Sequence, residues 1–450
     1  MHMPQRPEHL PLLPGYRADQ PLFLSGTGSV SHDELLALAT ALSQTLPAGA
    51  HVFNLCDDRY LFTLAFAAAL IRGSVSLFPP NRLASSCRSI AENYTDVVYV
   101  TDTLVEGLIR QARQPVPRPS GSELAMPHIE ADRLAFIAFT SGSTGRPRPQ
   151  PKHWSDLVGC ARAAARRFGF GPDLSIIATV PPQHMYGLEL SVLVPMTTGA
   201  RVTAARPFFP TDIRAELARA PAPRLLVTTP VHLAACVEAH LDWPAVAQVI
   251  SATAPLPAEL ARRVETTLST RVYEIYGSTE SGSIASRETC RAPRWRWYDS
   301  VRPHGNGDAV SVTADFIHGR VPLADVLDVQ DDGHFALLGR TADMIKVGGK
   351  RASLSELNLT LNAIDGVRDG AFVAPEPSGD QVGRLAVVAV APGLDRQAII
   401  AGLAGHIDPV FYPRRVVLVD RLPRNEAGKL PRDALLRLLD GDGGNTGNAH

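Results

Sequence analysis

In the middle of the chain, short apolar runs alternate with helical patterns, and this alternation constrains the fold more than any other feature of the sequence. RLLVTT at 224–229, AVAQVISA at 245–252 and RVYEIY at 271–276 are apolar runs of strand length. VHLAACVEAHL at 231–241 and PAELARRVETTL at 257–268 have apolar residues at helical spacing. Strands that alternate with helices form parallel βαβ units, so this part of the chain predicts a doubly wound sheet.

The first part of the chain repeats the alternation. HVFNL at 51–55 is followed by a helical pattern, RYLFTLAFAAALIRG at 59–73, which ends at a glycine, and by the strand-like run SVSLF at 74–78. DVVYV at 96–100 and LAFIAF at 134–139 are further runs of strand length. We therefore expect an α/β fold whose large N-terminal domain contains doubly wound βαβ sheets.

Two polar residues directly follow predicted strands. Thr140 comes after the run at 134–139, and Ser278 comes after the run at 271–276. In doubly wound sheets the ligand lies in a crevice outside the carboxyl ends of the strands. Both positions are therefore candidates for a ligand site.

The pattern changes near residue 340. Before it, VLDVQDDGHFALLG at 326–339 is typical of a β-hairpin with an Asp-Gly turn. After it, strands expected at 370–375, 385–392 and 415–420, with helices near 354–364 and 396–407, indicate a small α+β domain. We predict a first domain at 1–339, a hinge at 340–345, a mobile lid domain at 346–440 and a disordered tail at 441–450.

The composition excludes several functional classes. Of 450 residues, 45% are hydrophobic and 20% are charged, which suits a globular protein with a substantial core. A net charge of −1 gives no reason to expect nucleic acid or an anionic membrane as a partner. The five cysteines are scattered, and neither a signal peptide nor a membrane span is apparent. We expect a cytoplasmic protein that binds small molecules or another protein.

The segment TSGSTGRPRPQPK at 140–152 places hydroxyl side chains and glycines before a run of alternating prolines. Because glycines let backbone N–H groups approach an anion closely, the segment is a candidate phosphate cradle. It is not a Walker A loop, since no Gly-Lys-Ser/Thr follows and the prolines exclude a helix here. The next helix is expected from about Asp156, with Ser155 as its N-cap. A flexible Ser/Gly linker is the alternative interpretation.

Four segments, in this order, resemble the signature motifs of the adenylate-forming enzymes, which comprise acyl- and aryl-CoA ligases, adenylation domains of peptide synthetases and luciferases. They are TSGSTGRP at 140–147, YGSTE at 276–280, GRTADMIKVGGKR at 339–351 and LPRNEAGKLPR at 422–432. The resemblance spans most of the chain. It implies ATP-dependent activation of a carboxylic acid to an acyl adenylate, followed by transfer of the acyl group to a thiol.

The resemblance implies catalytic roles for three charged residues. Lys429 would bridge the α-phosphate and the carboxylate, two anions that must approach each other. Glu280 would hold Mg²⁺ against the phosphates of ATP, and Arg340 would contact the phosphates through its guanidinium. Without the resemblance, each is an ordinary charged residue of a turn or surface.

The resemblance also implies a set of nucleotide-binding residues. Tyr276 would stack on the adenine, Thr279 would donate to the α-phosphate, and Asp325 would bind the ribose. The whole set comprises Thr140, Ser141, Gly142, Ser143, Thr144, Gly145, Ala252, Thr253, Ala254, Tyr276, Gly277, Ser278, Thr279, Asp325 and Arg351.

The segment PPQHMYGLEL resembles the stretch that lines the acid pocket, with His184 at the mouth; a histidine beside apolar residues is otherwise a core residue. Members that activate amino acids present an aspartate in this region, and residues 181–192 contain none. Because a buried ammonium without a partner is costly, the resemblance favours an aryl or acyl acid. Thr253, where glycine is common, would narrow the pocket. The other pocket residues expected are Tyr186, Ser251 and Gly282.

Transfer to the thiol requires Lys429 to leave the adenylate, and in the family the C-terminal domain rotates on a hinge, here at Ala342. Gly348 and Gly349 would then line a narrow tunnel for the pantetheine thiol of coenzyme A or of an acyl carrier protein. The short chain also resembles compact ligases that load aryl or hydroxyacyl groups onto carrier proteins in aryl-polyene and related pathways.

Three residues depart from the motifs: Arg148 replaces the usual lysine, Pro149 the usual glycine, and Ala342 a charged hinge residue. A non-catalytic nucleotide-binding relative is therefore one alternative. A kinase or another nucleotide hydrolase with a similar phosphate loop is the other. ATP–pyrophosphate exchange that depends on an added acid separates these possibilities.

Overall fold

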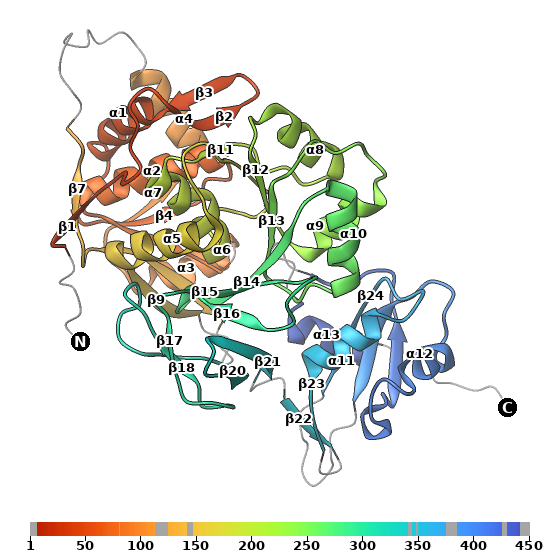
Figure 1. Ribbon diagram of the computed structural model, residues 1–450. Helices are drawn as coiled ribbons and strands as arrows, with labels where there is room; N and C mark the ends of the chain where they lie inside the picture. Colours follow the sequence, from red (N-terminus) through yellow and green to blue (C-terminus); the bar gives the residue numbers. More distant parts are fainter. Residues whose placement is uncertain are drawn as a thin grey trace. The chain divides into compact units, whose positions relative to one another are not determined.

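The computed structural model describes residues 7–80, 82–112, 125–141, 147–340, 344–347, 350–374, 385–424 and 430–441 (Figure 1). The chain divides into two compact units, which are described separately. The first comprises Met1–Ala252, Ala258–Arg302 and Thr313–Val321. The second comprises Thr253–Pro257, Pro303–Val312 and Pro322–His450.

The first unit contains a sheet built from the N-terminal runs. The first four strands in its order are parallel, and the last strand pairs antiparallel. The order is β6(Val97–Val100), β4(His51–Asn54), β5(Val75–Phe78), β8(Leu134–Ser141) and β9(Pro147–His153).

The second sheet of this unit has a parallel centre with antiparallel pairs at its margins. Within the unit its order is β16(Trp295–Trp297), β15(Gly282–Glu288), β14(Val272–Ser278), β13(Gln248–Ser251), β12(Arg224–Thr228), β10(Ser175–Ala178), β11(Arg201–Thr203), β2(Pro21–Ser25) and β3(Gly28–Ser31). The predicted βαβ alternation is confirmed, because α9(Pro230–Glu238) and α10(Ala258–Leu268) connect successive parallel strands and pack against each other (Figure 1).

Further helices and short strands complete the described part of the first unit. A two-stranded ladder joins β1(His9–Pro11) to β7(His128–Glu130). The helices are α1(His32–Ser43), α2(Arg59–Arg72), α3(Ala84–Ala91), α4(Asp102–Ala112), α5(Trp154–Phe168), α6(Met185–Leu188), a π-helix at Glu189–Leu193, α7(Val194–Thr198) and α8(Pro210–Arg219).

Helix α2 is apolar on nearly every side, which is typical of a buried helix, and nearly all of its residues are buried in the first unit. Asp58 caps its first turn by accepting from the backbone N–H of Leu61, and Gly73 ends it with φ 75°, a left-handed conformation that favours glycine. The helix also carries Arg59, whose exposed fraction is 0%.

All five N–H donors of Arg59 are used. Nε donates to Ser191 Oγ at 2.9 Å, and the two terminal nitrogens donate to the carbonyl oxygens of Ala178, Val180, Thr203 and Ala205 at 2.9–3.0 Å. Burial lowers its pKa to about 10, so the side chain stays charged at neutral pH. Arg59 therefore joins α2 to the loops that follow β10 and β11.

The alternating prolines form strand β9 at the edge of its sheet, which agrees with the prediction that they exclude a helix. Successive strand residues face opposite sides, so prolines at alternate positions turn their missing N–H groups to one side. An edge strand tolerates this because that side has no partner strand.

The predicted N-cap Ser155 is wrong: α5 begins at Trp154 and its N-cap is His153.

After two short segments, the second unit continues with a hairpin of β20(Asp325–Val329) and β21(His334–Arg340). This hairpin was predicted from the sequence, and Gly333 in its turn has φ 80°. A second hairpin joins β22(Met344–Val347) to β23(Lys350–Ser353). A three-stranded sheet then follows in the order β24(Asp369–Val373), β25(Ala386–Val390) and β26(Arg415–Leu418). The helices are α11(Leu354–Asn362), α12(Arg396–Leu403), a 3₁₀ turn at Pro409–Phe411 and α13(Arg432–Gly441).

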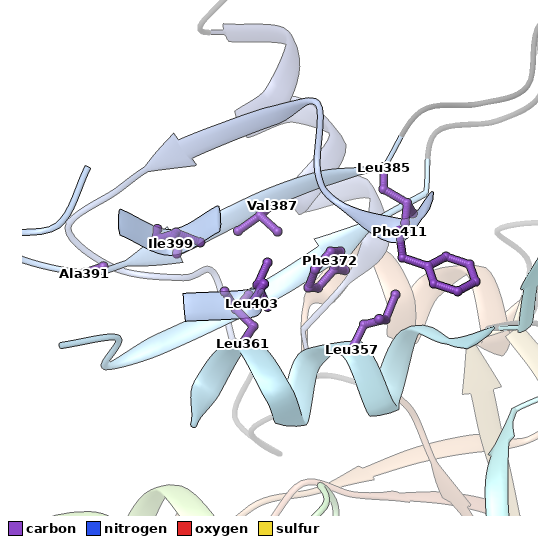
Figure 2. Packing of buried hydrophobic residues seen from close by; sticks show 10 residues of the cluster. Leu357, Leu361, Phe372, Leu385, Val387, Ala391, Ile399, Leu403 and Phe411 are labelled. Atoms are coloured by element: carbon purple, nitrogen blue, oxygen red, sulfur yellow. The ribbon is translucent and has the colours of Figure 1, made fainter. Parts of the chain in front are cut away.

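The core of the second unit lies between this sheet and its helices. Figure 2 shows Leu357 and Leu361 of α11 pointing toward Phe372 and Val387 of the sheet, with Leu403 of α12 beside them. A second cluster, which includes Val388 and Leu435, forms around α13. This packing confirms the predicted small α+β domain.

Three short strands lie at sequence positions where the chain passes from one unit to the other: β17(Arg302–His304), β18(Ser311–Thr313) and β19(Val321–Pro322). The predicted hinge at 340–345 includes residues 341–343, which lie outside the described ranges, so its position stays a prediction.

Within the part of the chain that the structure describes, every helix is too short or too polar to cross a bilayer.

Candidate active site

The described ends of the first motif lie in the antiparallel pair β8–β9. Thr140 pairs with Arg148, and Ser141 pairs with Pro147, so both ends of the motif belong to one hairpin. The prediction that Thr140 directly follows the strand is wrong, because Thr140 is the next-to-last residue of β8. Residues 142–146, which include Gly142, Ser143, Thr144 and Gly145, lie outside the described ranges.

The second motif forms the tip of the hairpin β14–β15. Ser278 is the last residue of β14, so the predicted strand end at Tyr276 is two residues short. The ladder shifts register between Tyr276 and Gly277, and a side chain at Gly277 would lie 2.0 Å from the carbonyl oxygen of Gly282. Only glycine permits this close approach of the two strands.

Hydrogen bonds order the turn that carries Glu280. The backbone N–H of Ser278 donates to Ser281 Oγ at 3.1 Å, and the backbone N–H of Ser281 donates to Ser278 Oγ at 3.3 Å. The Tyr276 ring is 9% exposed and packs against Trp295, with ring centroids 5.7 Å apart. The Glu280 side chain itself is half-buried at the tip.

Lys152 joins the first two motifs and was not singled out from the sequence. It is the sixth residue of β9, and its ammonium donates a hydrogen bond to the backbone carbonyl of Glu280. Burial lowers the pKa of Lys152, while nearby acids that include Asp156 and Glu280 oppose this shift. The strand that leaves the predicted phosphate cradle is therefore fastened to the turn that carries the predicted metal ligand.

A buried carboxylate, Glu189, holds the strand β15 that leaves the same turn. It is 1% exposed, and it accepts hydrogen bonds from the Ser283 backbone N–H at 3.0 Å and from the Ser283 hydroxyl. Burial raises its pKa, and the hydrogen bonds from Ser283 oppose that shift. Glu189 lies in the π-helix, a feature frequently found at functional sites.

The packing beside this carboxylate is close. A side chain at Gly282, which has φ 68°, would lie 2.6 Å from the Cys160 sulfur, so the position has room only for glycine. A sequence signal for Glu189 did exist, because a glutamate inside a long apolar stretch is costly unless it has partners. Its partner, 94 residues away, could not be identified from the sequence.

Two of the predicted acid-pocket residues, Tyr186 and Ser251, lie at the carboxyl ends of β12 and β13, whereas Gly282 is the first residue of β15. The Tyr186 hydroxyl donates to the carbonyl oxygens of Thr228 and Ile250, at 3.0 and 2.8 Å. Since these two carbonyls belong to neighbouring strands, Tyr186 holds the strand ends together. His184 is the N-cap residue of α6 and is half-buried.

A second histidine, His232, lies at the carboxyl ends of β10 and β12. His232 Nδ1 is 2.9 Å from Thr229 Oγ1 and 3.4 Å from Thr179 Oγ1, and burial lowers its pKa. Within the described ranges its Nε2 is buried and makes no hydrogen bond. Sequence reasoning missed His232 because a histidine inside a helical pattern carries no local mark of function.

The segment from Ser251 to Ala254 is strained where the resemblance places the nucleotide. Thr253 has φ 80°, a conformation that is unfavourable for a β-branched residue. The hydroxyls of Ser251 and Thr253 are buried and make no hydrogen bond with described residues. Buried polar atoms of this kind are suited to bind a polar ligand.

In the second unit, the hairpin β20–β21 brings two predicted residues together. Asp325 and Arg340 are direct cross-strand partners, and Arg351 pairs with Lys346 in the next hairpin. The predictions for Ala342, Gly348, Gly349 and Lys429 fall on residues outside the described ranges.

Comparisons with known proteins agree with the motifs. The family model "AMP-binding enzyme" matches residues 37–305. The 4-coumarate–CoA ligase of Halorhodospira halophila is 29% identical over 305 residues, which cover 65% of this chain and 73% of that protein. The 3-hydroxybenzoate–CoA ligase of Aromatoleum sp. (strain CIB) is 25% identical over 499 aligned positions, which cover 94% of each protein.

Solved structures have the same fold. The o-succinylbenzoate–coenzyme A synthetase of Bacillus subtilis in complex with AMP superposes with a TM-score of 0.80 at 16% identity, covering 92% of this chain and 95% of that one. On the strength of the family match, this chain belongs to the AMP-binding enzymes, the adenylate-forming superfamily that its four motifs predicted.

Proposed function

We propose that this protein uses ATP to convert a small aryl or acyl carboxylic acid into an acyl adenylate, and passes the acyl group to the pantetheine thiol of coenzyme A or of an acyl carrier protein in the cytoplasm. The family match and the ligases among the relatives confirm the reaction class predicted from the motifs, an ATP-dependent acid–thiol ligase. They give no support to a kinase, a hydrolase or a non-catalytic relative.

One observation carries the assignment of the site: Lys152 ties the strand that leaves the TSGSTG segment to the turn that carries Glu280. Adenylate formation requires donors and a cation ligand held at fixed positions around the phosphates, because charge spreads over the phosphate oxygens in the transition state. In this assignment, Thr140 to Gly145 and Thr279 donate to the phosphates. Lys152 and Glu189 position the turn and do not touch the nucleotide.

Glu280 fits the role of a magnesium ligand. Its half-buried carboxylate stands on an ordered turn and makes no hydrogen bond with the described residues. Mg²⁺ commonly takes one or two protein carboxylates together with phosphate oxygens, so one such group is sufficient. When bound, the ion would neutralise charge on the phosphates.

The second unit would supply the remaining nucleotide contacts. We assign Asp325 to the ribose hydroxyls, and Arg340 and Arg351 to the phosphates. Lys429 would stabilise the approach of the carboxylate to the α-phosphate. Rotation at 340–345 would then withdraw Lys429, and Gly348 and Gly349 would face the pantetheine.

The proposed class of substrate, an acid without an amino group, rests on which carboxylates near the predicted pocket are available to bind an ammonium. Glu189 is the one acidic residue among 181–192, and its oxygens are already occupied by Ser283. No carboxylate of this segment is left to bind a substrate ammonium, so an uncharged aryl or acyl tail is favoured. The names of the 4-coumarate and 3-hydroxybenzoate ligases among the relatives support an aryl acid.

The proposal is tested by ATP–pyrophosphate exchange with a panel of aryl, hydroxyacyl and fatty acids. We expect exchange that depends on an added aryl or acyl acid and on Mg²⁺. The Lys429→Ala variant should lose exchange but should still form thioester from supplied acyl adenylate. Lys350→Ala is the matched control, since Lys350 is an exposed lysine of the same unit paired with Asp408. ATP binding without exchange for any acid would contradict the proposal, and so would equal loss of both half-reactions in Lys429→Ala.

A further inference from the structure

Three potential metal ligands meet on the first unit at the start of α5. His153 ends β9, Asp156 lies in the first turn of α5, and His318 comes from the segment Thr313–Val321. Asp156 Oδ2 is 3.5 Å from His153 Nδ1 and 3.8 Å from His318 Nδ1. One ligand atom from each of the three residues lies within 4.8 Å of the others.

The packing of the chain holds these residues in place. A side chain at Gly159 would lie 2.6 Å from Phe316 Cβ, so this glycine allows the segment that carries His318 to lie directly against α5. Phe316 and Ile317 are buried, at 2% and 5% exposed, and fix the segment there. Asp156 lies one helical turn before Gly159 on the same face, which brings its carboxylate next to His318.

His153 occupies a position where another residue type is expected. N-cap residues are usually Ser, Thr, Asp or Asn, whose side chains accept a hydrogen bond from the first turn. His153 makes no such capping bond, and within the described ranges its Nδ1 is buried without a hydrogen bond. Local rules broken in this way are expected at functional positions.

We propose that His153, Asp156 and His318 form a binding site for a divalent transition metal of the zinc class. Two imidazole nitrogens and one carboxylate oxygen suit Zn²⁺, Co²⁺ or Ni²⁺ and do not suit Mg²⁺, which prefers oxygen ligands. Ligands about 2.1 Å from a tetrahedral ion lie about 3.4 Å apart, close to the two separations from Asp156. Three protein ligands leave one coordination position for water.

The bound metal would join two parts of the chain that are separate in sequence. His153 directly follows Lys152, so the ion would fasten the end of β9 to the segment that carries His318. It is distinct from the magnesium ion assigned to Glu280, because that ion is bound through a different residue and by oxygen alone. The metal would therefore act on stability and on the position of β9, and the ligase reaction does not require it.

The probe is Co²⁺, added to the full chain without an affinity tag and followed by its visible ligand-field absorption. We expect saturable binding of one ion per chain, displacement by Zn²⁺, and a higher Tm in the presence of either metal. His318→Gln and Asp156→Asn should each weaken binding by roughly 100-fold or more, since even partners that only orient a ligand are worth about 10–100-fold. His334→Gln is the matched control, because His334 has one carboxylate neighbour, Asp332, and belongs to no such cluster in the described ranges.

His318→Gln decides the question if Asp156→Asn fails to fold, because the His318 side chain is 64% exposed and its replacement leaves the core intact. The absence of saturable Co²⁺ binding to the wild-type chain would overturn the proposal. Unchanged Co²⁺ affinity in His318→Gln would overturn it as well.

Discussion

Two hairpins carry the acidic residues assigned to the nucleotide, and they are built differently. The β14–β15 hairpin presents Glu280 at its tip. Lys152 of β9 donates to the Glu280 carbonyl, and Glu189 of the π-helix accepts from Ser283. The β20–β21 hairpin presents Asp325 at the end of its ladder away from the Asp-Gly turn, directly across from Arg340. The first depends on groups brought together by the fold, whereas local turn chemistry specifies the second.

The difference has an energetic consequence. Burying a carboxylate or an ammonium costs several kcal/mol unless hydrogen bonds compensate for the lost water. The first hairpin requires two such burials, which places Glu280 accurately but makes the turn sensitive to either partner. In the second, Asp325 is only half-buried, so changes there should affect binding more than folding.

Of the variants considered, Glu189→Ala is expected to lower stability and exchange activity the most. This change leaves the Ser283 N–H and hydroxyl buried without their acceptor, so the free energy of unfolding should fall by about 3 kcal/mol. Exchange activity should fall by about 100-fold, because a displacement of about 1 Å at a catalytic turn has that effect. Chemical denaturation and the exchange assay measure the two quantities.

Glu216→Ala is the control for that variant, since Glu216 is also a buried glutamate of the first unit but pairs with Arg219 in α8. It should lose stability without a comparable loss of activity per folded molecule. Equal activity loss in both variants would mean that Glu189 has no special relation to the Glu280 turn.

Lys152→Met should reduce exchange by about tenfold, equivalent to ~1.4 kcal/mol. The methionine removes the donor to the Glu280 carbonyl but also removes a desolvated ammonium, so Tm should change little. Lys350→Met, at an exposed lysine, should leave both quantities unchanged. A large fall in Tm with normal activity would show that Lys152 serves stability alone.

Asp325→Ala should raise the KM for ATP by about fivefold, as expected for one lost hydrogen bond of ~1 kcal/mol. The free energy of unfolding should stay within about 0.5 kcal/mol of the wild-type value, since Asp325 is only half-buried. Asp328→Ala, an exposed change in the same strand, is the control. An unchanged KM would remove Asp325 from the ribose assignment.

The smallest expected effect is on how the free energy of unfolding depends on pH. Burial raises the folded-state pKa of Glu189 above its ordinary value of 4.5, so between these two values the folded chain holds the proton more tightly than the unfolded chain. The contribution of this group to the free energy of unfolding therefore decreases as the pH rises through that window and is lowest above it.

Glu189→Gln lacks this titration, and its stability should depend less on pH from 4.5 upward. Urea denaturation at a series of pH values measures the slope. A Glu216→Gln variant should keep the slope due to Glu189. If Glu189→Gln keeps the full wild-type slope, another group is responsible for it.

The local patterns of the sequence were enough to predict the parallel strands, the glycine that ends α2, the Asp-Gly hairpin and the proline segment that excludes a helix. Each of these depends on residues within a few positions of one another, through periodicity, turn chemistry or a missing N–H. Ordered motifs then indicated the family, because their residue types and spacing reflect the chemistry of phosphate binding.

The tertiary structure alone decided which side chains support the site. Lys152 meets Glu280 across 128 residues, and Glu189 meets Ser283 across 94. Arg59 finds acceptors in the π-helix and at the ends of β10 and β11, more than a hundred residues away. It also decided that the N-cap of α5 is His153 and not Ser155, and it placed His153 against Asp156 and His318. Buried charges need partners, but a sequence reveals only the need; the partner is set by how distant strands and helices pack.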